Sequence, residues 1–216
     1  MKRVHVLVEG QTEELFVNEV MQPALPALSL TPVILATKRV KSGGKFKGGI
    51  GTFQQVKDDL RRLLNDTSAD AVTTLIDLYR LPDDFPGADN ATARARDRAT
   101  HIEAAISREM GSPARLMPYL SVHEFETLLF VSPERATTVF DRAQQLQLRA
   151  IAASYGGDVE LINDGPTTHP AARIRAIVPG YDKVLGGSIA ILETGLDAIC
   201  SSCPHFRDWF TRLAAL

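Results

Sequence analysis

Two carboxylates stand directly after apolar segments that are far apart in the sequence. Glu9 follows the apolar run at residues 4–8, and Asp77 follows the run at residues 71–76. Such runs, bounded by turn residues, are typical of buried strands in a parallel sheet, and open α/β sheets bind ligands at the carboxyl ends of their strands. If the two strands are neighbours, both carboxylates face one crevice, where they repel each other unless a cation lies between them. Oxygen ligands of this kind suit a hard divalent cation.

A further acidic pair follows the apolar segment at residues 115–120. Glu124 and Glu126 are two residues apart, so they would not share a face of a helix, but at a strand-to-helix turn both side chains can point at the same crevice. Glu13 and Glu14 instead fall in the first turn of the first predicted helix, where the helix dipole favours negative charge. We therefore interpret these two residues as structural.

A basic, glycine-rich stretch at residues 38–49 carries five positive charges, four glycines and no acidic residue. It lacks the Gly-x4-Gly-Lys-Ser/Thr pattern of a nucleotide-binding phosphate loop. Clustered charge with glycine suits contact with a nucleic-acid backbone, and a solvated loop explains the same composition equally well. Because the net charge of the chain is −2, nucleic-acid binding would need such a local patch. The charged residues are Lys38, Arg39, Lys41, Lys45 and Lys47.

The elements that must position these residues alternate between two patterns as far as residue 130. Strand-like segments are expected at residues 4–8, 31–36, 71–76 and 115–120, and helical spacing is expected at residues 12–28, 52–65 and 93–110. This alternation predicts an α/β fold with a parallel sheet of about four strands flanked by helices. Thr12 is expected to cap the first helix.

From residue 131 onward the pattern is helical, with helices expected at residues 132–154, at residues 189–199 and from Pro204. We therefore divide the chain into an α/β domain at residues 1–130 and a helical extension packed on it at residues 131–216.

Composition places the chain among ordinary globular proteins, with 216 residues, 44% hydrophobic and 23% charged. No signal-peptide pattern and no apolar run of membrane-spanning length occurs in the sequence, so we expect a cytoplasmic protein without a membrane partner. Cys200 and Cys203 lack the two further ligands of a zinc site and are interpreted as reduced packing thiols. His123 has no second histidine at the spacing of a zinc-protease motif.

Four sequence blocks carry a family resemblance. The segment VEGQTE after the first strand, with Asp77 after the third, resembles the Toprim fold, the metal-binding domain of topoisomerases, primases and nucleases of the overcoming-lysogenization-defect type. The blocks LVEGQTEE, VTTLIDLYRLP, YLSVHEFETLLF and CPHFRDWF together resemble the bacterial family catalogued as domain of unknown function 4276. This second resemblance covers nearly the full chain.

The Toprim resemblance implies roles for particular residues. Glu9 would act as a general acid or base or as a metal ligand, and Asp77 would be the first carboxylate of an Asp-x-Asp motif whose second position here is Tyr79. Glu124 or Glu126 would then supply the missing oxygen ligands, with Mg²⁺ or Mn²⁺ as the cofactor. Lys183 is a further candidate, for neutralising transition-state charge.

The function implied is a metal-dependent nuclease that hydrolyses phosphodiesters in an anti-phage or DNA-processing system, with nucleic acid as its partner. An alternative is a non-catalytic Toprim-like subunit that partners an ATPase. A third and weaker interpretation is a phosphatase or another phosphoryl-transfer enzyme with a small substrate.

Overall fold

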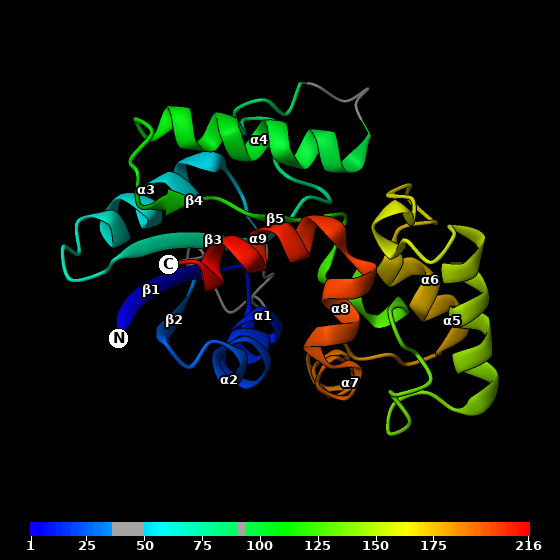
Figure 1. The fold of residues 1–216 in the computed structure, drawn as a ribbon. Coiled ribbons are helices and arrows are strands. Elements are labelled where there is room, and N and C mark those ends of the chain that lie inside the picture. The colour runs from blue at the N-terminus through cyan, green and yellow to red at the C-terminus, as the bar shows by residue number, and fades with distance from the viewer. Residues whose placement is uncertain (36–49, 90–93) are drawn as a thin grey trace, which may run out of the picture.

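A parallel sheet runs through the molecule. The computed structural model describes residues 1–35, 50–89 and 94–216. The strand order is β2-β1-β3-β4, with β5 also paired to β3 (Figure 1). All strand pairs are parallel, as the sequence predicts. The strands are β1 (Lys2–Val8), β2 (Leu28–Ile34), β3 (Ala71–Asp77), β4 (Leu116–Met117) and β5 (Leu120–Ser121).

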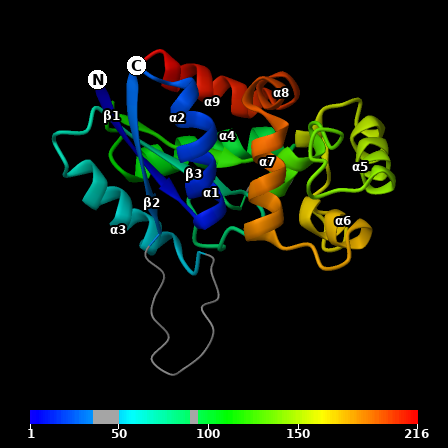
Figure 2. The same cartoon turned by 90° about the horizontal axis from the view of Figure 1, so that it is seen from below.

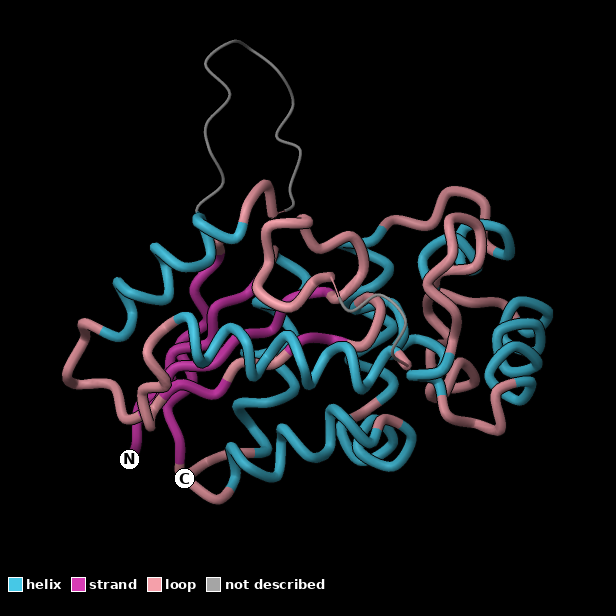
Figure 3. The backbone as a smooth tube through the Cα atoms, turned by 90° about the horizontal axis from the view of Figure 1, so that it is seen from above, coloured by secondary structure: helices cyan, strands magenta, loops and turns pink. Residues whose placement is uncertain are grey.

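Helices cover both faces of this sheet, which gives three layers (Figures 1 and 3). Helices α3 and α4 pack on one face, in a core cluster that includes Leu7 of β1 and Val72 of β3. The other face carries α1 and α9, in a cluster that includes Val4, Val6 and Val8. The helices are α1 (Gln11–Phe16), α2 (Gln22–Ala24), α3 (Phe53–Leu64), α4 (Ala95–Glu109), α5 (Arg142–Ser154), α6 (Pro170–Ile177), α7 (Ser188–Thr194), α8 (Leu196–Ser202) and α9 (Pro204–Ala214). Shorter helical segments are η1 (Val17–Met21), η2 (Phe125–Phe130), η3 (Val159–Leu161) and η4 (Lys183–Gly187).

The helices after residue 131 divide into two groups. Helix α9 crosses the sheet, whereas α5 and α6 lie beyond the carboxyl ends of the strands (Figures 1 and 2). The indole Nε1 of Trp209 in α9 donates a hydrogen bond to Thr73 Oγ1 in β3 at 2.9 Å. The C-terminal helix is therefore part of the main core.

Thr73 offers a test of this contact between α9 and the sheet. Its hydroxyl accepts from Trp209 and donates to the Met117 carbonyl. Thr73→Val is expected to lower the free energy of unfolding by about 1–3 kcal/mol, because the buried indole N–H and the carbonyl lose their partner. Urea denaturation measures this loss. Thr31→Val, at an exposed position of β2, is the matched control and should change stability by less than about 0.5 kcal/mol.

Several predicted boundaries are wrong. The second strand is Leu28–Ile34, three residues earlier than predicted at its start. The first helix begins at Gln11 after Gly10, with no side-chain cap, so Thr12 lies inside the helix and does not cap it. The fourth strand is two short pieces, because its pairing with β3 is interrupted between Met117 and Leu120.

Two predicted helices also differ from the observed ones. The helix expected from residue 132 begins only at Arg142, where the Asp141 side chain accepts a hydrogen bond from the Gln144 amide. The helix expected at residues 189–199 breaks at Gly195, whose φ of 81° lies in the left-handed region. Among the residues that the structure describes, no single helix is long and apolar enough to cross a membrane. The segments Lys183–Thr194 and Leu196–Ser202 meet those criteria only as a pair, bent by 86°.

Candidate functional site

Four acidic side chains gather at the carboxyl edge of the sheet around one lysine. We call Glu9, Glu13, Asp77 and Glu126 the carboxylate cluster. Glu9 follows β1 and Asp77 ends β3; these strands are hydrogen-bonded neighbours, with Val8 paired to Leu75. The other two acids are carried in by helices at the same edge, with Glu13 in α1 and Glu126 in η2.

Lys183, the first residue of η4, contacts three of these carboxylates. Its Nζ lies 3.2 Å from Glu126 Oε2, 3.5 Å from Asp77 Oδ2 and 3.9 Å from Glu13 Oε1. Glu9 joins through its Oε2, which accepts the backbone amide of Asp77 at 3.4 Å. The structure thus brings together four residues named from the sequence, and adds a fifth.

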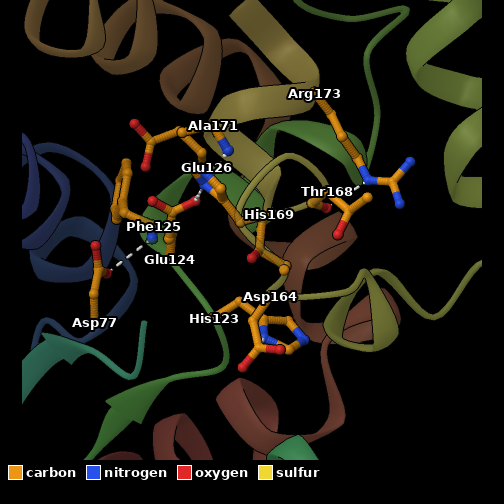
Figure 4. Close-up of polar contacts among 12 residues, drawn as sticks. Asp77, His123, Glu124, Phe125, Glu126, Asp164, Thr168, His169, Ala171 and Arg173 are labelled. Atoms are coloured by element: carbon orange, nitrogen blue, oxygen red, sulfur yellow. Dashed lines mark hydrogen bonds and ion pairs between the residues drawn. The ribbon is translucent and has the colours of Figure 1, made fainter. Parts of the chain in front are cut away.

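Backbone contacts orient Asp77 within the carboxylate cluster. The Phe125 amide donates to Asp77 Oδ1 at 2.9 Å (Figure 4), which leaves Oδ2 to face Lys183. Phe125 begins the short helix that carries Glu126. The start of η2 therefore positions two of the carboxylates: Asp77 through the Phe125 amide, and Glu126 as the next residue of the helix.

Burial changes the acidity of the carboxylate cluster. Burial raises the pKa of Asp77 well above its ordinary value, against the opposing effect of the Lys183 ammonium. Burial, and next the charge of Glu13, raise the pKa of Glu9, and burial likewise raises the pKa of Glu126. Burial alone would lower the pKa of Lys183, but the surrounding carboxylates, Asp77 first, raise it above its ordinary value.

Acidic groups outnumber basic groups in this cluster. Among the residues that the structure describes, four carboxyl groups lie around one ammonium, and Glu126 is only 1% exposed. Its Oε1 has no hydrogen-bond partner among the residues that the structure describes. A buried carboxylate oxygen without a donor is costly, and a divalent cation would satisfy it. The donor set fits a hard cation in its chemistry.

The spacing of the acids is not that of a closed metal shell. In the described ranges, no group of three or more His, Cys, Asp or Glu residues is arranged to hold a metal ion. Lys183 lies among the carboxylates instead, with its side chain 36% exposed. A metal ion could be held there only after Lys183 and some of the carboxylates move.

Glu124, also named from the sequence, makes different contacts. Its Oε2 lies 2.7 Å from His169 Nδ1 and accepts the Ala171 amide at 3.0 Å (Figure 4). It thereby binds the first turn of α6. The His169 ring stacks on Tyr79 with centroids 4.4 Å apart. Glu124 does not contact Lys183, so the structure does not bring it into the group around that ammonium.

His123, the residue before Glu124, lies close to Asp164 (Figure 4). Its Nδ1 is 3.8 Å from Asp164 Oδ2, beyond hydrogen-bond distance, and that oxygen accepts a hydrogen bond from Arg98 at 2.5 Å. Burial lowers the pKa of His123, although the Asp164 carboxylate opposes this shift. We assign His123 no role in the carboxylate cluster.

Two further predictions concern other parts of the chain. The basic residues Lys38, Arg39, Lys41, Lys45 and Lys47 lie outside the described residues. Cys200 and Cys203 are free thiols. His205, two residues after Cys203 in the sequence, has its Nε2 2.8 Å from Glu103 Oε1.

Sequence reasoning missed Glu13 as a member of the site. Its position in a first helical turn suggested a dipole-stabilising role, yet the side chain is buried, with 3% exposure. A usable signal was present: α1 begins two residues after Glu9, so its first turn must lie at the same edge of the sheet.

The fold and the site define a three-layer α/β protein with a buried acidic cluster at the carboxyl edge of its parallel sheet. The chain belongs to the family described as Domain of unknown function (DUF4276), which matches residues 8–214. No curated protein and no solved structure matches the chain.

Proposed function

We propose that this protein is a divalent-cation-dependent phosphodiesterase of the Toprim type that acts on nucleic acid. The observation that carries the proposal is the convergence of Glu9, Asp77 and Glu126 from three separate segments at one sheet edge. Such edges are where open α/β sheets bind ligands. Among the described residues, the excess of buried acidic groups over basic ones gives the cluster a reason to hold a cation.

Glu9, Asp77 and Glu126 would hold Mg²⁺ or Mn²⁺. When bound, such an ion stabilises negative charge on a phosphoryl group and lowers the pKa of a water molecule. Burial raises the pKa of Glu9 above its ordinary value, which makes this carboxylate a better proton acceptor. The Phe125 amide holds Asp77 Oδ1 in place, so this carboxylate needs little reorganisation on binding.

Lys183 would have different contacts in the metal-free and the metal-bound protein. With the metal absent, its ammonium neutralises part of the carboxylate cluster. Once a divalent cation takes over that role, the flexible side chain is free to contact a substrate phosphate, where a positive charge stabilises the charge that develops on phosphoryl oxygens. Its partial exposure gives it room to make this movement.

The basic stretch is the proposed contact for the nucleic-acid backbone. The last residue described before it, Leu35, donates its amide to the Val8 carbonyl at 2.9 Å. Leu35 therefore lies at the sheet edge that carries Glu9. The positive charges that follow Leu35 in the sequence favour a polyanionic substrate.

A cleavage assay tests the proposal. Purified protein is incubated with single- and double-stranded DNA and RNA, in Mg²⁺, in Mn²⁺ or in EDTA. We expect cleavage that requires metal and that disappears in the Glu9→Gln, Asp77→Asn double variant. Asp208→Asn, at a side chain 75% exposed on α9, is the surface control and should retain full activity. Cleavage that survives in the double variant would overturn the proposal.

A non-catalytic subunit that partners an ATPase, for instance in phage defence, is the second candidate. Lys183 favours it, because an ammonium already paired with three carboxylates can serve as a structural network without metal. Titration calorimetry with Mg²⁺ separates the two candidates. Binding that is lost in Asp77→Asn supports the phosphodiesterase, and no binding at millimolar Mg²⁺ supports the subunit.

Glu124 can be tested separately as a metal ligand. Glu124→Ala is expected to destabilise the fold by about 1–3 kcal/mol, because the Ala171 amide and His169 lose a buried acceptor. Its Mg²⁺ affinity should equal that of the wild type, whereas Glu126→Gln should weaken binding. Thermal unfolding and calorimetry on the two variants measure both effects. A weaker Mg²⁺ affinity in folded Glu124→Ala would return Glu124 to the ligand set.

A further inference from the structure

An apolar groove lies between α1 and the segment formed by η4 and α7. It has a volume of about 520 Å³, and we call it the α1–α7 groove. Its apolar walls are formed by Leu15, Val184, Leu185, Ile189 and Leu192. Leu185 is 67% exposed, Val184 50% and Leu192 43%. Large aliphatic side chains are rarely this exposed side by side unless another molecule covers them.

The charge at the groove has one sign. Glu14 and Glu19 of the helical segment after β1 are the charged residues among its lining, and no lysine or arginine that the structure describes lines it. An occupant with apolar side chains on one face and basic side chains beside them would satisfy both features. A second copy of this chain fits less well, since a two-fold contact through the groove would bring Glu14 and Glu19 of both copies together.

We propose that the α1–α7 groove binds a basic amphipathic helix of a partner protein. Two or three aliphatic side chains of that helix, spaced three or four residues apart, would enter between Leu15 and Leu185. Lysine or arginine side chains at the margin would face Glu14 and Glu19. This inference does not depend on the proposed phosphodiesterase activity.

The α1–α7 groove adjoins the carboxylate cluster, because neighbouring residues of α1 and of η4 belong to the two sites. In α1, Glu13 contacts Lys183 while its neighbour Glu14 lines the groove. In η4, Lys183 contacts the carboxylates while the next residue, Val184, lines the groove. The same two segments therefore form both sites, so a helix bound in the groove would contact the elements that hold Glu13 and Lys183.

Binding of two synthetic peptides tests the proposal. The probe is a fluorescein-labelled leucine–lysine peptide of about 16 residues with its leucines on one helical face, and the comparison peptide has glutamate in place of every lysine. Fluorescence anisotropy with the full chain should show a dissociation constant for the basic peptide at least about ten-fold lower than that for the acidic comparison peptide. Leu185→Asp should weaken its binding by about ten-fold or more. Leu146→Asp, at an exposed leucine on α5 outside the groove, should leave binding unchanged.

A charge exchange separates recognition from general adhesion. The double variant Glu14→Lys, Glu19→Lys should prefer the acidic peptide. Equal binding to wild type and Leu185→Asp, or a peptide preference unchanged by the charge exchange, would overturn the proposal. Sedimentation equilibrium provides the remaining comparison: a dimer that Leu185→Asp dissociates would overturn it in favour of a second copy, and a monomeric wild-type chain supports it.

Discussion

Asp77→Asn is expected to lower metal-dependent cleavage by about 10³-fold, because a lost metal ligand removes several kcal/mol of transition-state stabilisation. Asparagine keeps an oxygen that can accept the Phe125 amide, so the fold should remain. The loss would come from the missing charge at Oδ2, the oxygen that faces Lys183. Steady-state kinetics on a fluorescent oligonucleotide measures the change.

The matched control for this prediction is Asp208→Asn, which removes one negative charge from the surface. It should cleave at the wild-type rate. Circular dichroism and the melting temperature establish that Asp77→Asn is folded. A folded Asp77→Asn protein that cleaves at the wild-type rate would contradict the assignment of Asp77 to the site.

Lys183→Met is expected to lower the free energy of unfolding of the metal-free protein by about 2–3 kcal/mol. Removing one partner of a buried charge network leaves the other charges uncompensated. The value is discounted for solvent screening because the Lys183 side chain is 36% exposed. Urea denaturation in EDTA measures the loss, and Mg²⁺ is expected to restore most of it by binding the folded state.

The loss in Lys183→Met should also depend on pH. A carboxyl whose pKa is raised on folding contributes its stability below its unfolded pKa and loses it as the pH rises through the folded pKa. For Glu9 and Asp77, whose pKa values are raised above 4.5 and 3.8, this predicts falling metal-free stability as the pH rises from about 4. Removing the ammonium should steepen that fall.

Lys57→Met is the matched control, because Lys57 makes a single ion pair among the described residues, with Glu109, whose side chain is 48% exposed. It should cost less than about 1 kcal/mol, with no rescue by Mg²⁺. Equal losses in the two variants, or a Lys183→Met protein as stable as the wild type at pH 8 in EDTA, would show that the ammonium does not stabilise the carboxylate cluster.

The strands were predictable because the apolar runs are short, continuous and bounded by turn residues. The run before Asp77 becomes β3, which is buried along its whole length, and the run before Glu9 becomes β1. Since the carboxyl ends of parallel strands share an edge, the location of Glu9 and Asp77 at a common edge followed from those two runs. Pairing through Val8 and Leu75 supplies the neighbour relation, which no local pattern contains.

The parts that escaped prediction depend on contacts between distant segments. Lys183 was named from the sequence as a candidate, but its contacts with the carboxylates were not predictable. It lies more than a hundred residues from Asp77 in the sequence, and only the path of the chain through α5 and α6 returns it to the sheet edge. The break at Gly195 replaces one predicted helix with α7 and α8. This break has a local signal, a glycine inside an apolar helical pattern, but such a glycine is compatible with an unbroken helix.

The most direct test is a crystal structure of the protein grown with Mn²⁺, with data collected for anomalous scattering. We expect an anomalous peak about 2.1 Å from carboxylate oxygens of Asp77 and of Glu9 or Glu126, with the Lys183 ammonium moved away from that position. An ordered site in which Lys183 still contacts Glu126 and Asp77, with no anomalous peak at millimolar Mn²⁺, would contradict this expectation.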